Sequence, residues 1–470
     1  MRVLQFFRSL LTVERSERLK LFCLSISFLL IIGSYTVMRT LKDTFFVSIV
    51  GRECIPIVKL WAIIMLVPAV LLFSKLVDLV RRYQLIYIYS LLYGIGGCVI
   101  AYFLGHPTIG LPNTEPSSTR LFGWFIYLFI EGYSPFLVSV FWSFVHSITN
   151  PQESKVNYPI MVAASKFGGM VMALTGCLVL SYSLRTHGQG ISDVAVHQLL
   201  MIGSSVLILI VPMIIHILMH RVPRKMMHGY EAAYQAEKRI EKEHQGEKKE
   251  KTTILASLYS LFSGLIFLFR YPYALGMFGI VFSWEVINSF VSFERLAVIH
   301  TSIASRTMYL LQQDFMIHSA GLLIVLIGTR ALVELLGERK SLILVPLITG
   351  VLLAYYFSAQ SAASMAIVYV LLRVMNFAFA VPLRERLYTP TVKDIQFKSK
   401  LWIDSFGVKL AKGAGSGYNM LIMGLTQTTQ FSIGVAFFSA IIGCWTLISN
   451  YMGRSFEGAV SKNKVIGLDK

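Results

Sequence analysis

Charged side chains are scarce in this sequence, and acidic ones are scarcer than basic ones. Only 14% of the 470 residues are Asp, Glu, Lys or Arg, whereas 55% are hydrophobic. Soluble domains carry roughly 25% charged residues. The composition therefore excludes a soluble globular protein and indicates that lipid surrounds most of the chain.

The sequence also lacks the patterns of common enzymes. No serine, cysteine or carboxylate constellation suited to hydrolysis is present, and the histidines lack metal-ligand spacing. The run GVKLAKGAGSG (407–417) is not in the order of a phosphate loop and follows no predicted strand, so its glycines are interpreted as sites of close helix contact. No enzyme activity, metal or cofactor is predicted.

Cysteine is sparse as well. The five cysteines are dispersed, mostly within apolar segments and without paired spacing, which argues against a disulfide framework or a metal site. We interpret them as small buried hydrophobic residues: Cys23, Cys54, Cys98, Cys177 and Cys444.

Long apolar segments are abundant. Each is long enough to cross a hydrocarbon core of ~30 Å as a helix, and lipid cannot satisfy an open strand edge. Twelve spans are predicted, at about 20–38, 55–76, 84–104, 120–146, 158–181, 197–219, 272–293, 316–333, 341–358, 361–380, 402–426 and 431–453. The predicted fold is an all-α polytopic membrane protein.

A charge-dense segment separates the first six spans from the second six. The predicted domains are an N-terminal half (1–219), a charged cytoplasmic linker (220–256), a C-terminal half led by an interfacial amphipathic helix (257–453) and a cytoplasmic tail (454–470).

A short internal sequence repeat links the two predicted halves. LVDLVRRYQLI (76–86) follows span two, and LVELLGERKSLI (332–343) follows span eight. Each has an acid followed by basic residues, which resembles the loop signature of the major facilitator superfamily, with its two six-helix halves. The alternative is a pair of ordinary turns with membrane-flanking basic residues.

The net charge of +18 is explained by topology. The basic residues lie mostly beside apolar spans, on the side shared by both termini and the linker, and they form no stripe with interleaved aromatics. The sequence therefore predicts cytoplasmic termini and no nucleic-acid partner.

Ionisable residues inside the spans are the candidate site residues, because each costs about 2.5–3.5 kcal/mol to insert. Glu131 lies near the centre of span four, and Lys412 lies within span eleven. Such midspan positions cannot easily snorkel to the headgroups, whereas lysines near span ends can. Those lysines are therefore open to either interpretation. The further candidates are Lys42, Lys59, Lys166, Arg373 and Lys409.

These candidates include more cations than acids. Several buried ammonium groups need a counter-charge that one or two carboxylates cannot supply, so we expect an anionic cargo such as a phosphate compound. Lysine suits a site that must release its ligand, because its ammonium acts as a movable point charge.

Three ordered segments resemble one known family. They are MRTLKDTFFVSIVGRECIPIVKLW (38–61), FIEGYSPFLVSVFWSFVHSITNPQESKVNYPIMVAASKFGGMV (129–171) and KSKLWIDSFGVKLAKGAGSG (398–417). Together they are similar to the ATP/ADP translocase family, the nucleotide transporters of plastids and obligate intracellular bacteria. By this resemblance, Lys42, Glu131 and Lys412 fall on charged positions important for transport. It implies ATP, ADP or a related nucleotide as substrate, carried across a cell inner membrane.

Span seven departs from the family pattern. Asn288 fits the pattern, but Ser292 stands at the expected acid, and Glu294 is displaced by two residues, roughly 200° around a helix. Three functions therefore stay open: exchange of ATP for ADP, uptake of another nucleotide or NAD with or without proton symport, and a membrane-embedded enzyme or non-transporting scaffold.

Overall fold

The computed structural model describes residues 15–149, 151–185, 192–223, 268–298, 302–327, 336–391, 395 and 399–467. In this part of the chain the regular elements are helices, apart from one isolated bridge between Thr391 and Ile466. The predicted linker falls largely, and the body of the leading amphipathic helix entirely, outside the described residues.

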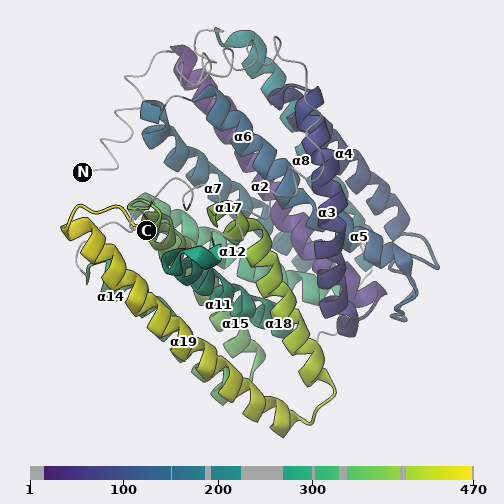
Figure 1. Cartoon of the computed structure of the whole chain (residues 1–470). Helices are drawn as coiled ribbons and strands as arrows, with labels where there is room; N and C mark the ends of the chain where they lie inside the picture. The colour runs from purple at the N-terminus through teal and green to yellow at the C-terminus, as the bar shows by residue number, and fades with distance from the viewer. Residues whose placement is uncertain are drawn as a thin grey trace, which may run out of the picture. The chain divides into compact units, whose positions relative to one another are not determined.

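The described helices form two compact units (Figure 1). The first unit is built around α2, which packs along α7, α8 and α5, while α4 packs along α8. Its elements are α2 (Arg15–Ile49), η1 (Arg52–Cys54), α3 (Ile55–Leu79), α4 (Arg82–Leu104), α5 (Leu121–Glu131), η2 (Ser134–Val138), α6 (Ser139–Ile148), α7 (Pro151–Arg185), α8 (Asp193–Arg221) and α12 (Ile303–Ile327).

The second unit is built around α11, which packs along α18, α19 and α15, while α14 packs along α19. Its elements are α11 (Pro272–Arg295), α14 (Glu338–Ala359), α15 (Ala362–Met375), η4 (Asn376–Ala380), α16 (Val381–Leu387), α17 (Lys400–Trp402), η6 (Ile403–Gly407), α18 (Val408–Met423) and α19 (Gln427–Ser461).

Each predicted span coincides with a helix or a run of helices, which confirms the all-α polytopic fold. Eight helical stretches among the described residues are long and apolar enough to cross a membrane: α2, α4, α5 to α6, α7, α8, α11, α14 and α19. The other four predicted spans correspond to α3, α12, the run from α15 to α16, and the run from α17 to α18.

The predicted start of span eight is wrong. Apolarity placed it at 316, but α12 begins at Ile303, and its first half contains Arg306, Gln313 and Asp314. These polar residues are covered by other helices of the first unit, so a purely apolar criterion passes over them. Although α12 lies within the range of the predicted C-terminal half, it belongs to the first unit. The domain boundaries themselves stay a prediction.

Close helix contact depends on small residues at a few places. A Cβ added at Gly168 of α7 would lie 2.3 Å from the Leu29 carbonyl oxygen of α2, and one at Gly415 of α18 would lie 2.9 Å from the Val286 carbonyl oxygen of α11. The interpretation of the 407–417 glycines as contact residues is confirmed at Gly415. By contrast, a Cβ at Gly417 would meet nothing within 4 Å.

The cysteines are all free thiols, but their surroundings differ. Only Cys23 is buried, Cys444 is exposed, and the other three are half-buried. The interpretation as small buried hydrophobic residues therefore holds for Cys23 alone.

Candidate functional site

The Lys42 ammonium is the most deeply buried charge of the first unit that sequence reasoning identified. It lies on α2, 5% exposed, and its Nζ is 2.7 Å from Glu131 Oε2 of α5 and 3.5 Å from Asp43 Oδ1. The ammonium also sits 4.2 Å from the centre of the Tyr127 ring. Thus two residues predicted separately, Lys42 and Glu131, form one ion pair beneath an aromatic face.

A second ion pair lies one helical turn away on α2, and sequence reasoning missed it. Arg39 Nη2 donates to Asp314 Oδ1 of α12 over 2.6 Å, and the Thr40 hydroxyl donates to Asp314 Oδ2 over 2.7 Å. The Asp314 side chain is 1% exposed. A buried carboxylate held by a guanidinium and a hydroxyl keeps its charge compensated.

Lys166 joins this second cluster from α7. Its aliphatic stem faces the backbone of α12, because a Cβ at Gly321 would lie 3.4 Å from Lys166 Cδ. Its ammonium lies within electrostatic range of Arg39 and His318. The Thr36 hydroxyl lies 2.8 Å from the Ile32 carbonyl oxygen and forms a hydrogen bond of 3.0 Å with His318 Nε2 of α12.

The charges of the first unit are therefore more balanced than the sequence indicated. The cations Arg39, Lys42 and Lys166 lie among the carboxylates of Asp43, Glu131 and Asp314. The sequence-based count of intramembrane acids missed Asp314, because Asp314 lay outside the predicted span, so the excess of cations around α2 is smaller than expected. An anionic ligand would have to compete with carboxylates for these cations.

Polar residues of the second unit gather along α11 and α18. Asn288 Nδ2 donates to Glu285 Oε2 over 3.0 Å, and Ser289 Oγ lies 3.4 Å from the Lys412 carbonyl oxygen. Glu285 is an acid in span seven that sequence reasoning overlooked, although an acid within an apolar run was the signal to find it. The structure thus brings the predicted residues Asn288 and Lys412 to one helix pair.

Lys412 is half-buried on α18. Within the described part of the chain its ammonium has no hydrogen-bond or ion-pair partner. Lys409 lies one turn earlier on the same helix, half-buried, and Lys59 lies half-buried on α3 of the first unit.

Glu294 and Arg373 of the second unit each contact a tyrosine. The Tyr356 hydroxyl donates to Glu294 Oε2 over 3.0 Å. Arg373 of α15 and Arg295 of α11 share the Tyr369 ring, with guanidinium carbons 5.3 and 4.1 Å from its centre. Glu294 is therefore engaged within the protein at its displaced position.

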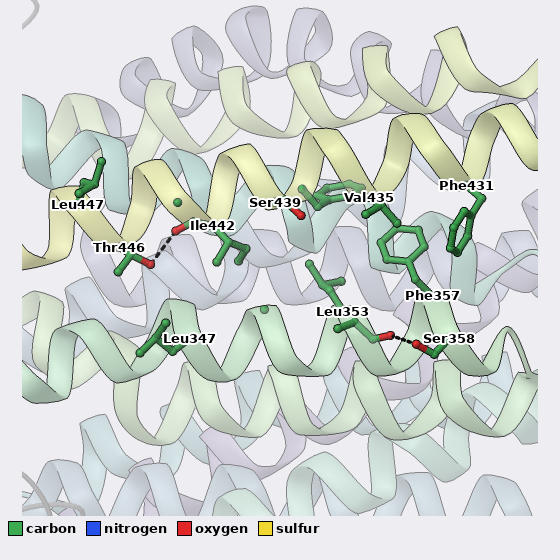
Figure 2. Close-up of a pocket in the computed structure, with 14 residues that line it drawn as sticks. Leu347, Leu353, Phe357, Ser358, Phe431, Val435, Ser439, Ile442, Thr446 and Leu447 are labelled. Atoms are coloured by element: carbon green, nitrogen blue, oxygen red, sulfur yellow. Dashed lines mark hydrogen bonds between the residues drawn. The ribbon is translucent and has the colours of Figure 1, made fainter.

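A cavity of about 800 Å³ lies elsewhere in the second unit, between α14 and α19 (Figure 2). Its walls are apolar side chains such as Leu353, Phe357 and Phe431. The hydroxyls of Ser358 and Thr446 donate to carbonyls of their own helices, as the dashed lines in Figure 2 show. The lining contains no cation, so it does not suit a phosphate.

The sequence profile of one family matches nearly the whole chain. The profile described as TLC ATP/ADP transporter covers residues 2–117 and 120–456. The chain belongs to this family. The resemblance carried by the segments 38–61, 129–171 and 398–417 is thereby confirmed, and the chain is a multi-pass membrane protein of the ATP/ADP transporter family.

Curated relatives of this ATP/ADP transporter family member come from Rickettsia. ADP,ATP carrier protein 5 of Rickettsia bellii is 23% identical over 446 residues, which are 86% of each chain. ADP,ATP carrier protein 1 of Rickettsia prowazekii is 21% identical over 509 residues, with 96% of each chain covered.

Solved structures show which fold the family member adopts. A D-xylose-proton symporter matches with a TM-score of 0.59 at 13% identity, covering 93% of this chain and 96% of that one. The major facilitator superfamily proton:xylose symporter XylE matches with a TM-score of 0.56 at 15% identity, covering 95% and 97%. These likenesses confirm the major-facilitator-like fold predicted from the sequence.

Proposed function

We propose that this protein exchanges ATP for ADP across a cell inner membrane by alternating access, and that it is not an enzyme. Its family membership supports nucleotide transport, and the names of its relatives support adenine nucleotides. No hydrolysis is needed, because antiport runs on the nucleotide gradients themselves.

The Lys42–Glu131 pair is the observation that carries this proposal. A lysine held by a carboxylate at 2.7 Å in the membrane is a cation with a replaceable counter-charge. A nucleotide phosphate can take the place of Glu131, and Glu131 then binds a proton or another cation. Binding and release are thereby coupled to the charge state of one acid.

Other cations have supporting roles in the proposal. Lys412, which lies in the second unit, binds a phosphate of the substrate. Among the described residues its ammonium has no hydrogen-bond or ion-pair partner. Lys59, Lys166 and Lys409 add positive potential. Lysine rather than arginine favours release, since it makes no bidentate clamp on phosphate.

A transport assay tests the exchange directly. Purified full-length protein is reconstituted in liposomes, and uptake of labelled ATP is compared between vesicles loaded with ADP and vesicles loaded with buffer. We expect uptake only with internal ADP. Absence of ATP uptake under both conditions would rule the proposal out.

Span seven favours a second candidate, the uptake of another nucleotide or NAD with or without proton symport. Glu294 is engaged by Tyr356, and the acid beside Asn288 is Glu285, which precedes it by one turn. This arrangement places the acids of span seven differently from the family pattern. Competition of labelled ATP uptake by unlabelled nucleotides and NAD, at two external pH values, separates this candidate from simple exchange.

A further inference from the structure

A polar seam joins α2 to α12 within the first unit. Hydroxyl residues recur on α2 at every fourth position, so they lie on one face of the helix. Their partners are on α12: Ser48 with Arg306 at 3.3 Å, Thr44 with Thr307 at 3.3 Å, Thr40 with Asp314 at 2.7 Å and Thr36 with His318 at 3.0 Å.

One contact of this seam is much stronger than the rest. Neutral hydrogen bonds between membrane helices contribute little each. The Arg39–Asp314 pair differs, because removing Arg39 would leave the buried Asp314 carboxylate without this counter-charge. The attachment of α12 to α2 through this seam therefore depends mainly on Arg39.

The two members of that ion pair differ in exposure. The Arg39 side chain is 26% exposed, whereas Asp314 is 1% exposed. Of the two side chains, a soluble anion can therefore reach Arg39 but not Asp314. Arg39 also lies three residues before Lys42 on α2, which places both cations on neighbouring positions of one helix face.

We propose that Arg39 binds the phosphate chain of the nucleotide together with Lys42, and that Asp314 occupies Arg39 when no nucleotide is bound. A phosphate that takes Arg39 from Asp314 breaks the Arg39–Asp314 ion pair and so weakens the seam between α2 and α12, whose hydrogen bonds at Thr36, Thr40 and Thr44 remain. Nucleotide binding thereby releases α12. This inference rests on the proposed function, because it assigns a further residue to the same substrate.

The binding half of the inference is tested by nucleotide affinity in the purified full-length protein. Dissociation constants for ATP and AMP are measured for the wild type, Arg39→Gln, Asp314→Asn and the control Arg18→Gln, an exposed arginine on the same helix. Arg39→Gln should weaken ATP binding about tenfold or more and narrow the difference between ATP and AMP. Asp314→Asn should tighten ATP binding, because it removes the competing carboxylate.

Melting temperatures separate a binding effect from misfolding. If Arg39→Gln melts near the wild-type temperature yet binds ATP equally well, the inference is wrong while the proposed exchange stands. If Arg39→Gln fails to fold, Asp314→Asn decides, since a purely structural pair predicts no gain in ATP affinity. A wild-type protein that binds no nucleotide overturns the proposed function and this inference together.

The release of α12 is tested by a reversible lock. The hydroxyls of Thr44 and Thr307 are 3.3 Å apart, so cysteines at both positions can form a disulfide between α2 and α12. Oxidation of the Thr44→Cys/Thr307→Cys double variant should stop transport, and reduction should restore it. Oxidation should leave transport by either single variant unchanged. Full transport in the oxidised double variant, with the disulfide verified by mass spectrometry, would refute the release step.

Discussion

At the scale of single residues, the α2 site consists of cations that already have carboxylate partners. Lys42 lies against Glu131, and Arg39 lies against Asp314. A buried cation without a counter-charge would be costly, so these acids stabilise the site in the absence of ligand. They also make ligand binding a competition between two kinds of anion.

The Lys42–Glu131 pair gives a first prediction, because its two members act in opposite directions. Lys42→Gln should lower the apparent affinity for ATP roughly tenfold to a hundredfold, since a hydrogen bond to a charged group contributes about 1.5–3 kcal/mol. Glu131→Gln should tighten ATP binding, because it removes the carboxylate that competes for Lys42, and it should slow exchange. Filter-binding and proteoliposome uptake measure the two effects. Equal loss of binding in both variants would contradict the assignment.

The lysines of α18 give a second prediction. Lys412 shares a contact with Ser289 of α11, whereas Lys409 stands one turn away on the same helix. Lys412→Gln should therefore raise the half-saturating ATP concentration of uptake about tenfold, and Lys409→Gln should raise it less. If Lys409→Gln raised the half-saturating ATP concentration more than Lys412→Gln, Lys409 rather than Lys412 would face the substrate.

Sequence reasoning found part of this site, and the misses have physical causes. Glu131 was found because a carboxylate in the middle of an apolar run is conspicuous. Asp314 was missed because its neighbours are polar, so that the span predicted from hydropathy began only at residue 316, two residues after it. Arg39 was missed because the first predicted span ended at residue 38, whereas α2 continues to Ile49.

At the scale of helices, the sequence predicts where apolar surface lies and misses polar packing between helices. The twelve spans were visible because lipid-facing and buried apolar residues both raise hydropathy. The α2–α12 seam was not visible in the sequence, although its pattern is simple: Thr or Ser stands at positions 36, 40, 44 and 48. Hydroxyls in a helix usually satisfy themselves on their own backbone, so spacing alone does not reveal a partner helix.

Among the described residues, π-helical turns interrupt the helices at Ser134–Val138, Asn376–Ala380 and Ile403–Gly407. Glu131 stands three residues before the first turn, and Arg373 stands three residues before the second. Such turns are frequent at functional sites. The shared spacing in spans four and ten is consistent with the internal repeat predicted from the loops.

Glycine packing gives a third prediction, with a matched control on one helix. A Cβ at Gly415 would lie 2.7 Å from Ser289 Cβ, whereas a Cβ at Gly417 would meet nothing within 4 Å. Gly415→Ala should destabilise the protein by about 1–3 kcal/mol through overpacking of α11 against α18. Gly417→Ala should be neutral or slightly stabilising. Thermal denaturation in detergent measures both, and similar melting temperatures for the two variants would disprove the close contact.

At the scale of the whole molecule, the topology gives a fourth prediction. Basic residues beside the spans favour the side on which both termini lie, so both termini are expected in the cytoplasm. An epitope tag at either end should be protected from protease in spheroplasts, whose inner membrane is intact and accessible, and cleaved after permeabilisation. Cleavage of one tag in spheroplasts would mean an odd number of crossings.

The carboxylate partners of Arg39 and Lys42 also determine how a membrane potential acts on the carrier. With Asp314 and Glu131 in place, the α2 site is nearly neutral when empty, so voltage acts mainly on the step that carries the nucleotide. A charge that crosses the full potential changes in energy by ~2.3 kcal/mol per 100 mV. Because ATP carries one more negative charge than ADP, an interior-negative potential opposes ATP uptake. Inward exchange would then depend on a high ratio of ATP to ADP outside the cell.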